Sequence, residues 1–219
     1  MTREEFSRIK EMPGEERIAR PGEVVLREHD TSSLMYIVLE GMGLRYKTLP
    51  DGSRQVVGFM FPGDMVGLQA GFSDKMGHAL EATTQMRLRT LKTQDLERTF
   101  EDDPERALAI TRFAVEEESA LGEALATVGQ REAIARLAWL FCKIHDRLTS
   151  IGMDEDVGLP LPYRQQDVAD ALGLSLVHTN KTLAKLKRDD IASWTGKTLH
   201  IHDFNRLQQL LDGADINVG

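Results

Sequence analysis

The chain has 219 residues, a formal net charge of −8 at pH 7 and one cysteine, Cys142. A single cysteine excludes an intrachain disulfide framework and any zinc or iron–sulfur site that needs several thiolates. The acidic balance argues against indiscriminate binding to polyanions, so a nucleic-acid surface has to be a local one. The charged opening segment is not a secretory signal and no apolar run is long enough to span a bilayer, so we expect a cytoplasmic protein with two domains.

Residues from about 21 to 91 are predicted to form short strands separated by glycine turns. Runs rich in β-branched and aromatic residues alternate with turn-forming pairs, namely Pro21-Gly22, Glu40-Gly41, Asp51-Gly52 and Pro62-Gly63. This pattern is typical of a compact antiparallel sandwich or barrel. A structural β domain that binds no ligand stays open as an alternative.

Residues 104–149 are predicted to form one long helix that begins at Pro104. Small and apolar residues recur along one stripe of this helix and would allow a second helix to approach closely. We therefore expect a twofold dimer whose interface contains Ile110, Ala114, Leu121, Ala124 and Val128. The alternative is that the stripe, which also contains Glu117 and Arg131, packs on its own domain. Cys142 is expected to take part in helix packing rather than redox sensing.

A loop over about 150–162 is predicted to lead into a second domain. It is followed by a helix over about 164–172, a turn at Gly173 and a second helix over about 176–189, which Ser175 caps. A small hairpin then turns at Thr195-Gly196, and a short closing helix ends at Gly213. Helix, tight turn, helix and hairpin is the order of a winged helix-turn-helix.

The second of these helices concentrates positive charge. Residues 176–188 contain four cations and no acid, whereas residues 151–219 together hold seven cations and ten acids. Thr179, Leu183 and Leu186 are expected to pack on the preceding helix. This leaves an outer face of Val177, His178, Asn180, Lys181, Ala184, Lys185 and Arg188. Such a face suits the major groove of DNA, and the alternative is a solvated surface.

The segment "RQQDVADALGLSLVHTNKTLAKLKRDDI", followed by "TGKTLHIHD", resembles the DNA-binding domain of the CRP/FNR family of bacterial transcription regulators, particularly members with a "VHTNR"-like recognition helix. The stretches "PGEVVLREHD" and "YIVLEGMGLRYKTLPDGSRQVVGFMFPGDMVGL" are similar to that family's β-roll of the cyclic-nucleotide-binding type. The helix between them occupies the place of its dimerisation helix, so the resemblance covers nearly the whole chain.

The resemblance implies an α+β fold in three parts: an antiparallel β-roll over 1–103, a dimerisation helix over 104–149 and a winged helix-turn-helix over 150–219. It also implies a homodimer that regulates transcription, binds double-stranded DNA at an inverted repeat and contacts RNA polymerase, with the β-roll as the candidate effector sensor. The alternative is a ligand-binding signalling module that acts through protein partners, with the acidic loop 154–156 as a contact.

Carried over residue by residue, the family's base-facing positions fall at Val177, His178, Asn180 and Lys181. Lys181 stands where an arginine usually reads guanine, and lysine lacks the planar fork of arginine, so base discrimination is expected to be weaker there. Val177 replaces a base-contacting glutamate, so the family's operator sequence does not carry over. The positions that touch phosphates are Arg164, Gln166, Ser175, Lys185 and Lys197.

The resemblance places an effector pocket around residues 67–81, with Gly67, Leu68, His78 and Ala79 at its key positions. Members that bind cyclic AMP have a glutamate and an arginine–serine pair where Leu68, His78 and Ala79 stand here, so cyclic AMP is not expected. The lack of N-terminal cysteines excludes the family's iron–sulfur cluster. Haem bound through His29, His78 or His145 stays open but is not favoured. Regulation by abundance alone, with a vestigial pocket, is a further alternative.

Motifs of catalysis do not occur in the sequence. It holds no phosphate loop of the Walker type, no GxSxG, no HExxH and no paired carboxylates at a familiar spacing. We therefore predict no enzyme activity, no catalytic residues and no metal ligands.

Overall fold

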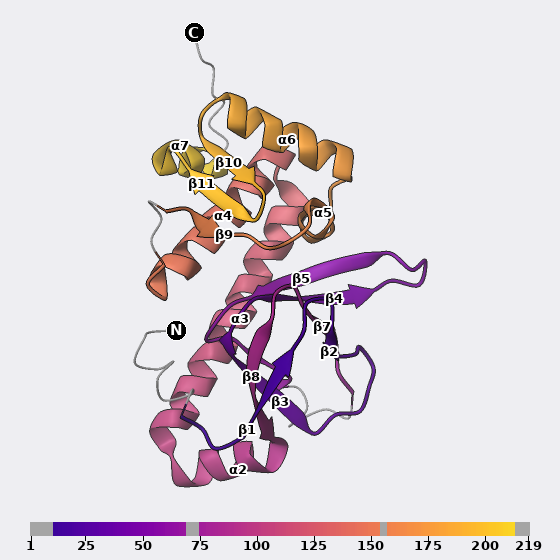
Figure 1. The fold of residues 1–219 in the computed structure, drawn as a ribbon, viewed down its shortest axis with the longest axis vertical. Coiled ribbons are helices and arrows are strands. Elements are labelled where there is room, and N and C mark those ends of the chain that lie inside the picture. Colours follow the sequence, from indigo (N-terminus) through magenta and orange to yellow (C-terminus); the bar gives the residue numbers. More distant parts are fainter. Residues whose placement is uncertain (1–10, 69–74, 154–156, 213–219) are drawn as a thin grey trace. The chain divides into compact units, whose positions relative to one another are not determined.

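The computed structural model describes residues 11–68, 75–153 and 157–212, which divide into two compact units (Figure 1). Residues up to Ala120 belong to the first unit and residues from Leu121 to the second. Within the described residues, no helix is both long and apolar enough to cross a membrane.

The described part of the first unit contains two four-stranded antiparallel sheets. One has the order β1-β8-β3-β6 and the other the order β2-β7-β4-β5. The strands are β1 (Glu15–Ala19), β2 (Val24–Leu26), β3 (Leu34–Glu40), β4 (Gly43–Thr48), β5 (Arg54–Met60), β6 (Met65–Val66), β7 (Ala79–Ala82) and β8 (Met86–Lys92). The predicted antiparallel β-roll is confirmed.

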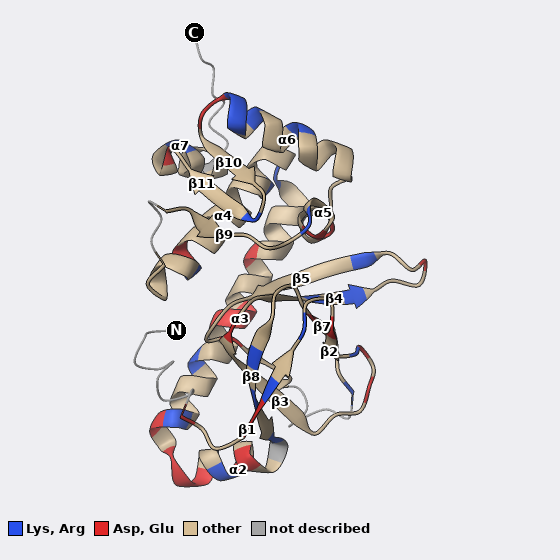
Figure 2. Ribbon diagram, viewed as in Figure 1, with Lys and Arg blue, Asp and Glu red and all other residues tan. Residues whose placement is uncertain are grey.

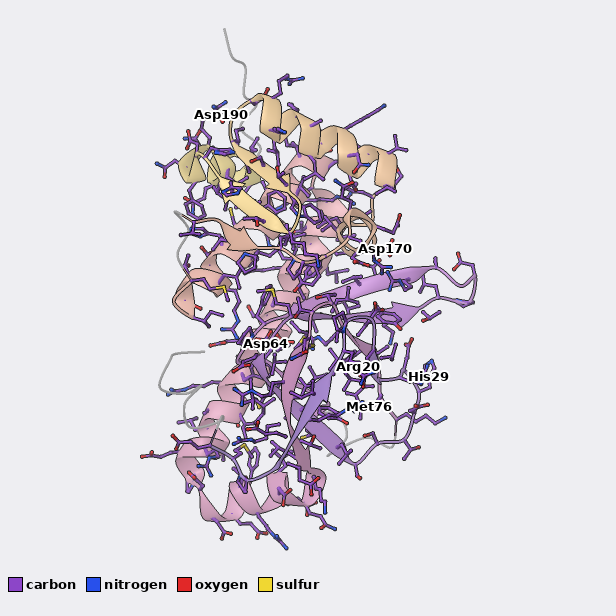
Figure 3. All side chains as sticks on the ribbon, viewed as in Figure 1. Arg20, His29, Asp64, Met76, Asp170 and Asp190 are labelled. Carbon is purple, nitrogen blue, oxygen red and sulfur yellow. The ribbon has the colours of Figure 1, made fainter. Side chains whose placement is uncertain are left out.

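The glycines of the predicted turns adopt left-handed backbone conformations, with φ between 82° and 99°. Gly41 shows why no other residue fits between β3 and β4, because a Cβ there would lie 2.1 Å from the carbonyl oxygen of Gln85. In the turn before β6, the buried carboxylate of Asp64 accepts a hydrogen bond from the backbone N–H of Phe61 at 2.8 Å (Figure 3). These turns set the register of the strands around them.

Strand β3 is buried on both faces, since its alternate residues enter two separate cores. Tyr36 and Val38 lie in the core between the two sheets, together with Leu80 and Leu88. The residues between them face the helices, in a second core of Met12, Met35, Ile37, Leu39, Met65, Leu91, Leu96, Ala109, Ile110 and Phe113. Helix α2 (Thr93–Asp102) contributes Leu96 to this core and was not expected from the sequence.

The helix predicted over 104–149 is two helices, α3 (Pro104–Gln130) and α4 (Ala133–Ser150). Glu132 has an extended backbone with φ −71° and ψ 161°, which interrupts the helical path. The carbonyl oxygen of Arg131, left free at the end of α3, accepts a hydrogen bond from Nε of Arg136 at 2.7 Å. Gly129 is the sequence signal for a break, because glycine is a poor helix former.

The predicted dimerisation stripe is consequently not one continuous surface. Ile110 is wrongly placed in it, because the first turns of α3 cover the β1-β8-β3-β6 sheet and bury Ile110 in that unit's core. Ala114 and Leu121 are exposed, while Ala124 and Val128 are half-buried. The middle of α3 is the part of the stripe that stays accessible.

The second unit confirms the winged helix-turn-helix. After α4 its elements are β9 (Leu159–Pro160), α5 (Gln165–Leu172), α6 (Leu176–Arg188), β10 (Ala192–Thr195), β11 (Thr198–Ile201), α7 (Phe204–Gln209) and the 3-10 turn η2 (Leu210–Asp212). Strand β9 lies in the segment predicted as a loop and pairs with β11, which gives a three-stranded sheet of order β10-β11-β9. Gly213, the predicted end of the closing helix, and the acidic loop 154–156 lie outside the described residues.

Candidate DNA-binding surface

The turn between α5 and α6 is built by two local features. Gly173 ends α5 in the left-handed conformation, with φ 62°, which favours glycine. Ser175 then caps α6 as predicted, since its hydroxyl accepts a hydrogen bond from the backbone N–H of His178 at 3.2 Å. The chain thus leaves one helix and begins the next within three residues.

The inner face of α6 is packed and its polar groups are satisfied. Thr179, Thr182 and Leu186 are buried, whereas the predicted core residue Leu183 is half-buried. The hydroxyl of Thr179 donates to the carbonyl oxygen of Ser175 at 3.1 Å, and the hydroxyl of Thr182 donates to that of His178 at 2.9 Å. Because both buried hydroxyls have acceptors, they add no penalty for unpaired polar groups.

The outer face of α6 is exposed and carries the predicted base-facing residues. Val177 is 65% exposed, and His178, Asn180 and Lys181 are also exposed. Lysines and an arginine continue along this helix toward its end (Figure 2). Within the described residues, the side chains of Asn180, Lys181 and Lys185 have no hydrogen-bond or ion-pair partner. Their polar groups are therefore available to a partner.

The residues predicted to contact phosphates differ in whether their side chains already have partners within the protein. The guanidinium of Arg164 donates to the buried carboxylate of Asp167, with Nη2 to Oδ1 at 2.7 Å, and Gln166 donates to Asp170 at 2.6 Å. Lys197 is exposed at the turn between β10 and β11. A phosphate could bind Lys197 directly, whereas at Arg164 it would compete with an internal carboxylate.

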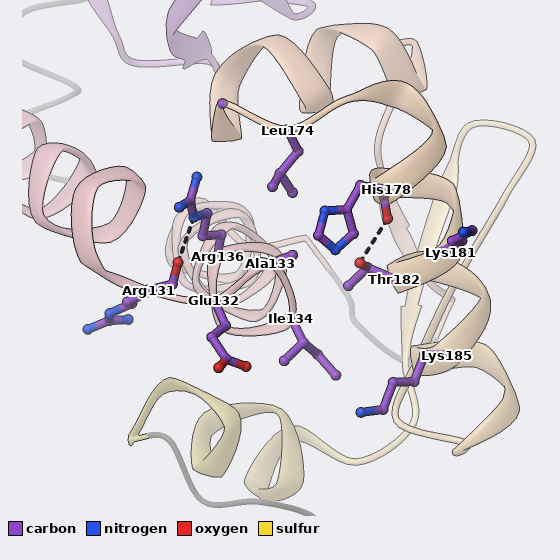
Figure 4. A pocket seen from close by; sticks show the side chains of 11 residues that line it. Arg131, Glu132, Ala133, Ile134, Arg136, Leu174, His178, Lys181, Thr182 and Lys185 are labelled. Atoms are coloured by element: carbon purple, nitrogen blue, oxygen red, sulfur yellow. Dashed lines mark hydrogen bonds between the residues drawn. The ribbon is translucent and has the colours of Figure 1, made fainter.

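A groove of about 660 Å³ separates the start of α4 from α6 (Figure 4). His178, Thr182 and Lys185 extend from α6 toward the first turn of α4, and Lys181 also lines the groove. Glu132 makes no side-chain hydrogen bond to the first amides of α4, so the positive end of this 18-residue helix is uncapped there. Lysines and a helix N-terminus together make this groove suited to anions.

Arg136 was not singled out from the sequence, although it joins the parts of this surface. Its Nε atom donates to the carbonyl oxygen of Arg131 at 2.7 Å, and its Nη1 atom donates to that of Leu172 at 2.9 Å. Leu172 is the last residue of α5, so one guanidinium connects the end of α3, the start of α4 and the turn before α6. An arginine near a helix start gives no sequence signal for this role.

The predicted effector-pocket residues that the structure describes lie in different local settings. Leu68 packs against the core between the β1-β8-β3-β6 sheet and the helices. A Cβ added at Gly67 would lie 2.9 Å from the carbonyl oxygen of Leu34. Ala79 is buried opposite Tyr46 of β4.

His78 is the buried polar residue of this group, at 9% exposure. Burial, together with the smaller effects of the charges of Arg45 and Lys47, lowers the pKa of its imidazole to about 4, whereas the charge of Glu28 opposes this shift. The ring is therefore neutral at pH 7. Arg45 was not expected here, because the two cations of the segment "GLRYKT" give no indication in the sequence that Arg45 points inward.

The other two histidines weighed as haem ligands lie in unrelated settings. His29 is on the loop after β2 with φ 68° and a largely exposed side chain (Figure 3). His145 belongs to the second unit, where its ring centroid lies 4.2 Å from that of Phe204. The backbone N–H of His29 donates to the carbonyl oxygen of Met76 at 2.8 Å.

Cys142 is buried on α4, as expected for a packing residue. Burial, with a smaller contribution from the charge of Asp146, raises the pKa of its thiol to about 11. The thiolate that reacts with oxidants is therefore scarce at neutral pH.

A β-roll followed by a winged helix-turn-helix with an exposed basic second helix defines a class: transcription regulators that join a sensor-type domain to a DNA-binding domain. Residues 16–103 match the model of cyclic nucleotide-binding domains, and residues 135–210 match that of Crp-like helix-turn-helix domains. The chain belongs to the CRP/FNR family of DNA-binding transcription regulators.

Three similar proteins illustrate this membership. The nitrogen fixation regulation protein FixK of Bradyrhizobium diazoefficiens is 33% identical over 76% of this chain and 69% of its own. The transcriptional activatory protein AadR of Rhodopseudomonas palustris is 30% identical over 78% of this chain and 70% of its own. The structure of FixK2 from Bradyrhizobium japonicum superposes with a TM-score of 0.82 and 26% identity, covering 90% of this chain and 97% of that chain.

Proposed function

We propose that the chain acts as a homodimer that binds an inverted-repeat DNA site, with one α6 helix in the major groove of each half-site. The outer face of α6 carries this proposal, because Val177, His178, Asn180 and Lys181 are exposed on a helix whose opposite face is buried. An α-helix fits the major groove, where each base pair presents a distinct pattern of donors and acceptors.

Each base-facing side chain has a defined chemical preference. The amide of Asn180 can pair with N6 and N7 of adenine, and the ammonium of Lys181 can donate to O6 or N7 of guanine. Val177 offers only apolar contact, which suits the methyl group of thymine. His178 has donor and acceptor nitrogens and lines the groove next to α4 as well.

We further propose that the DNA backbone follows the groove between α6 and the start of α4. Lys185 and the uncapped first turn of α4 would then contact successive phosphates, since both present positive charge to the groove. Ser175, Lys197, Arg164 and Gln166 are proposed as further phosphate contacts. At Arg164 the phosphate would share the guanidinium with Asp167.

The dimer is proposed to form through the accessible middle of α3. Large apolar residues there are exposed, with Val115 at 60%, Leu121 at 50% and Leu125 at 77%. Burying such residues against a second copy would remove apolar surface from water. A twofold dimer of this type places its half-sites about one DNA turn, roughly 34 Å, apart.

The remaining assignments complete the proposal. The β-roll is the candidate effector sensor, RNA polymerase is the proposed protein partner at promoters, and the chain carries out no catalytic step. Cyclic AMP stays disfavoured as the effector, because Leu68, which takes the position of the ribose-binding glutamate, packs in an apolar core.

The proposal is tested by fluorescence anisotropy with labelled promoter fragments, including the chain's own promoter. Asn180→Ala and Lys181→Ala are each expected to weaken sequence-specific binding while the fold, checked by circular dichroism, is unchanged. Lys75→Ala is the matched control, because Lys75 is an exposed lysine of the first unit. Specific binding that is as strong in both α6 variants as in the wild type would refute the proposed role of this helix.

A further inference from the structure

The face of β4 that points into the β-roll carries two cations. Arg45 and Lys47 lie two residues apart on β4 and therefore on the same face of the strand. Arg45 pairs across the sheet with Leu80 of β7, which is fully buried in the core between the two sheets. Because directly opposite residues point to the same side of a sheet, the side chain of Arg45 is directed inward.

A glycine on the neighbouring strand makes room for the guanidinium. Gly58 of β5 is the partner of Arg45 on its other side. A Cβ at Gly58 would lie 2.8 Å from Nη2 and 3.0 Å from Nε of Arg45. The planar guanidinium therefore rests against the backbone of β5, where any larger residue would displace it.

Two buried nitrogen atoms at this place lack hydrogen-bond partners. They are Nε of Arg45 and Nε2 of His78, neither of which meets an acceptor or donor within the described residues. An unpaired buried polar atom is costly and rare, and it often marks a position that a ligand satisfies. His78 follows Gly77, whose carbonyl oxygen accepts a hydrogen bond from Lys47 at 2.6 Å, and precedes Ala79, the register partner of Tyr46, so it lies beside the part of β4 that carries Arg45.

The outer part of the same guanidinium is held by helix α3. Nη2 of Arg45 donates to the carboxylate of Glu117, and the two side chains are only 15% and 31% exposed. Glu117 lies on α3 between Val115 and Leu121, which belong to the proposed dimer surface. Glu117 thus occupies Nη2 of a guanidinium whose Nε atom has no partner within the described residues.

We propose that Arg45 and His78 bind a small organic oxyanion, a carboxylate or a phosphate monoester, which competes with Glu117 for the guanidinium of Arg45. Guanidinium groups match these oxyanions in shape and charge, and the imidazole supplies a second hydrogen bond to a ligand oxygen. Ligand binding releases Glu117 and so changes the contact between β4 and α3. The inference rests on the proposed function, because α3 is the helix through which the dimer is proposed to form.

The test uses the full-length protein, isotope-labelled, and follows the ring signals of His78 by NMR. Acetate and inorganic phosphate are added in separate titrations. The chloride concentration is lowered at each step so that the ionic strength stays constant. A saturable shift with either anion supports the site, and the anion that causes it identifies the ligand class. Absence of a saturable shift with both anions overturns the proposal.

Two substitutions distinguish competition from simple binding. Arg45→Gln should abolish saturation, whereas Glu117→Gln should tighten the dissociation constant by about two- to fivefold, because a partly exposed ion pair no longer competes. The matched control is Glu118→Gln, an exposed residue of the same helix, which should leave the constant unchanged. If Glu117→Gln binds the anion no more tightly than the wild type does, the proposed competition between Glu117 and the anion is wrong. This result decides the point even if Arg45→Gln fails to fold.

DNA binding is measured on the same samples by fluorescence anisotropy. If the oxyanion site is absent, the wild-type chain still binds its DNA and only the inference about Arg45 and His78 fails. If specific DNA binding is absent while the His78 signals shift, the proposed function fails and the oxyanion site stands. The two failures are therefore distinguishable.

Discussion

Nη1 of Arg136 donates a hydrogen bond to the carbonyl oxygen of Leu172 at 2.9 Å, which joins helix α4 to the last residue of helix α5. The same side chain holds the carbonyl oxygen of Arg131 at the break between α3 and α4. One arginine therefore fixes the helix-turn-helix against the helix that leads into it. The pose of α6 depends on this connection.

Replacing Arg136 with alanine should destabilise the protein and weaken DNA binding. The two carbonyl oxygens lose charged donors, each worth roughly 1.5–3 kcal/mol if no water replaces it. Urea denaturation and anisotropy measure the two effects. Lys143→Ala on the same helix is the control, since Lys143 forms a half-exposed ion pair with Glu123 whose loss costs about 0–1 kcal/mol. Equal stabilities of the two variants would contradict the role given to Arg136.

Lys181 and Lys185 should affect DNA binding in different ways. Lys181→Ala removes a proposed base contact, so it should cost about 1–3 kcal/mol and relax preference at one position of each half-site. Lys185→Ala removes a proposed phosphate contact, so it should weaken binding to all sequences alike. It should also reduce the slope of log affinity against log salt by about 1 for each subunit. Identical salt slopes for wild type and Lys185→Ala would remove Lys185 from the backbone contacts.

The stability of the protein should fall at mildly acid pH because of His78. Burial and the charges of Arg45 and Lys47, against the opposing charge of Glu28, lower the pKa of His78 from 6.5 to about 4 in the folded protein. Above pH 6.5, His78 is neutral in both the folded and the unfolded protein, and its contribution to stability is fully present. As the pH falls from 6.5 toward 4, His78 binds a proton more readily in the unfolded protein than in the folded one, so this contribution is lost.

The expected loss is at most roughly 3 kcal/mol, from a pKa shift of about two and a half units. It is measured as the difference between the unfolding free energies at pH 7 and pH 4.5. His78→Gln, which cannot titrate in this range, should lack this part of the pH dependence. A variant with the same pH profile as the wild type would show that His78 titrates normally.

Cys142 should be unreactive in the folded protein. Because burial raises the pKa of its thiol to about 11, the thiolate fraction at pH 7.5 is very small and the sulfur is also shielded. A thiol reagent such as Ellman's reagent should label it slowly under native conditions and fully in denaturant. Rapid labelling of the native protein would reopen a role for Cys142 in redox sensing.

Local signals in the sequence predict much of this fold. The turn glycines, the cap at Ser175, the apolar run of β3 and the alternation along β10–β11 act over a few residues, and the structure confirms the elements that they predict. The exposure of Val177, His178, Asn180 and Lys181 also follows from helical periodicity. These features can be inferred because each depends on neighbours in the chain.

Features that depend on distant parts of the chain could not be inferred in this way. Ile110 looks like an interface residue until the sheet that covers it is known, and the two-residue strand β9 exists only through its pairing with β11. The inward direction of Arg45 depends on its register with Gly58 and Leu80. Arg136 likewise acquires its role only when α4 and α5 come together.

The most direct measurement of the central claim is the selection of binding sites from a random DNA library by the wild type and by Asn180→Ala. The account predicts that the wild type enriches an inverted repeat whose half-sites are centred about 10 base pairs apart. Asn180→Ala should keep this spacing and lose preference at one symmetry-related position in each half-site. Enrichment of a site without twofold symmetry, or of the same sequence by both proteins, would contradict recognition of DNA by a pair of α6 helices.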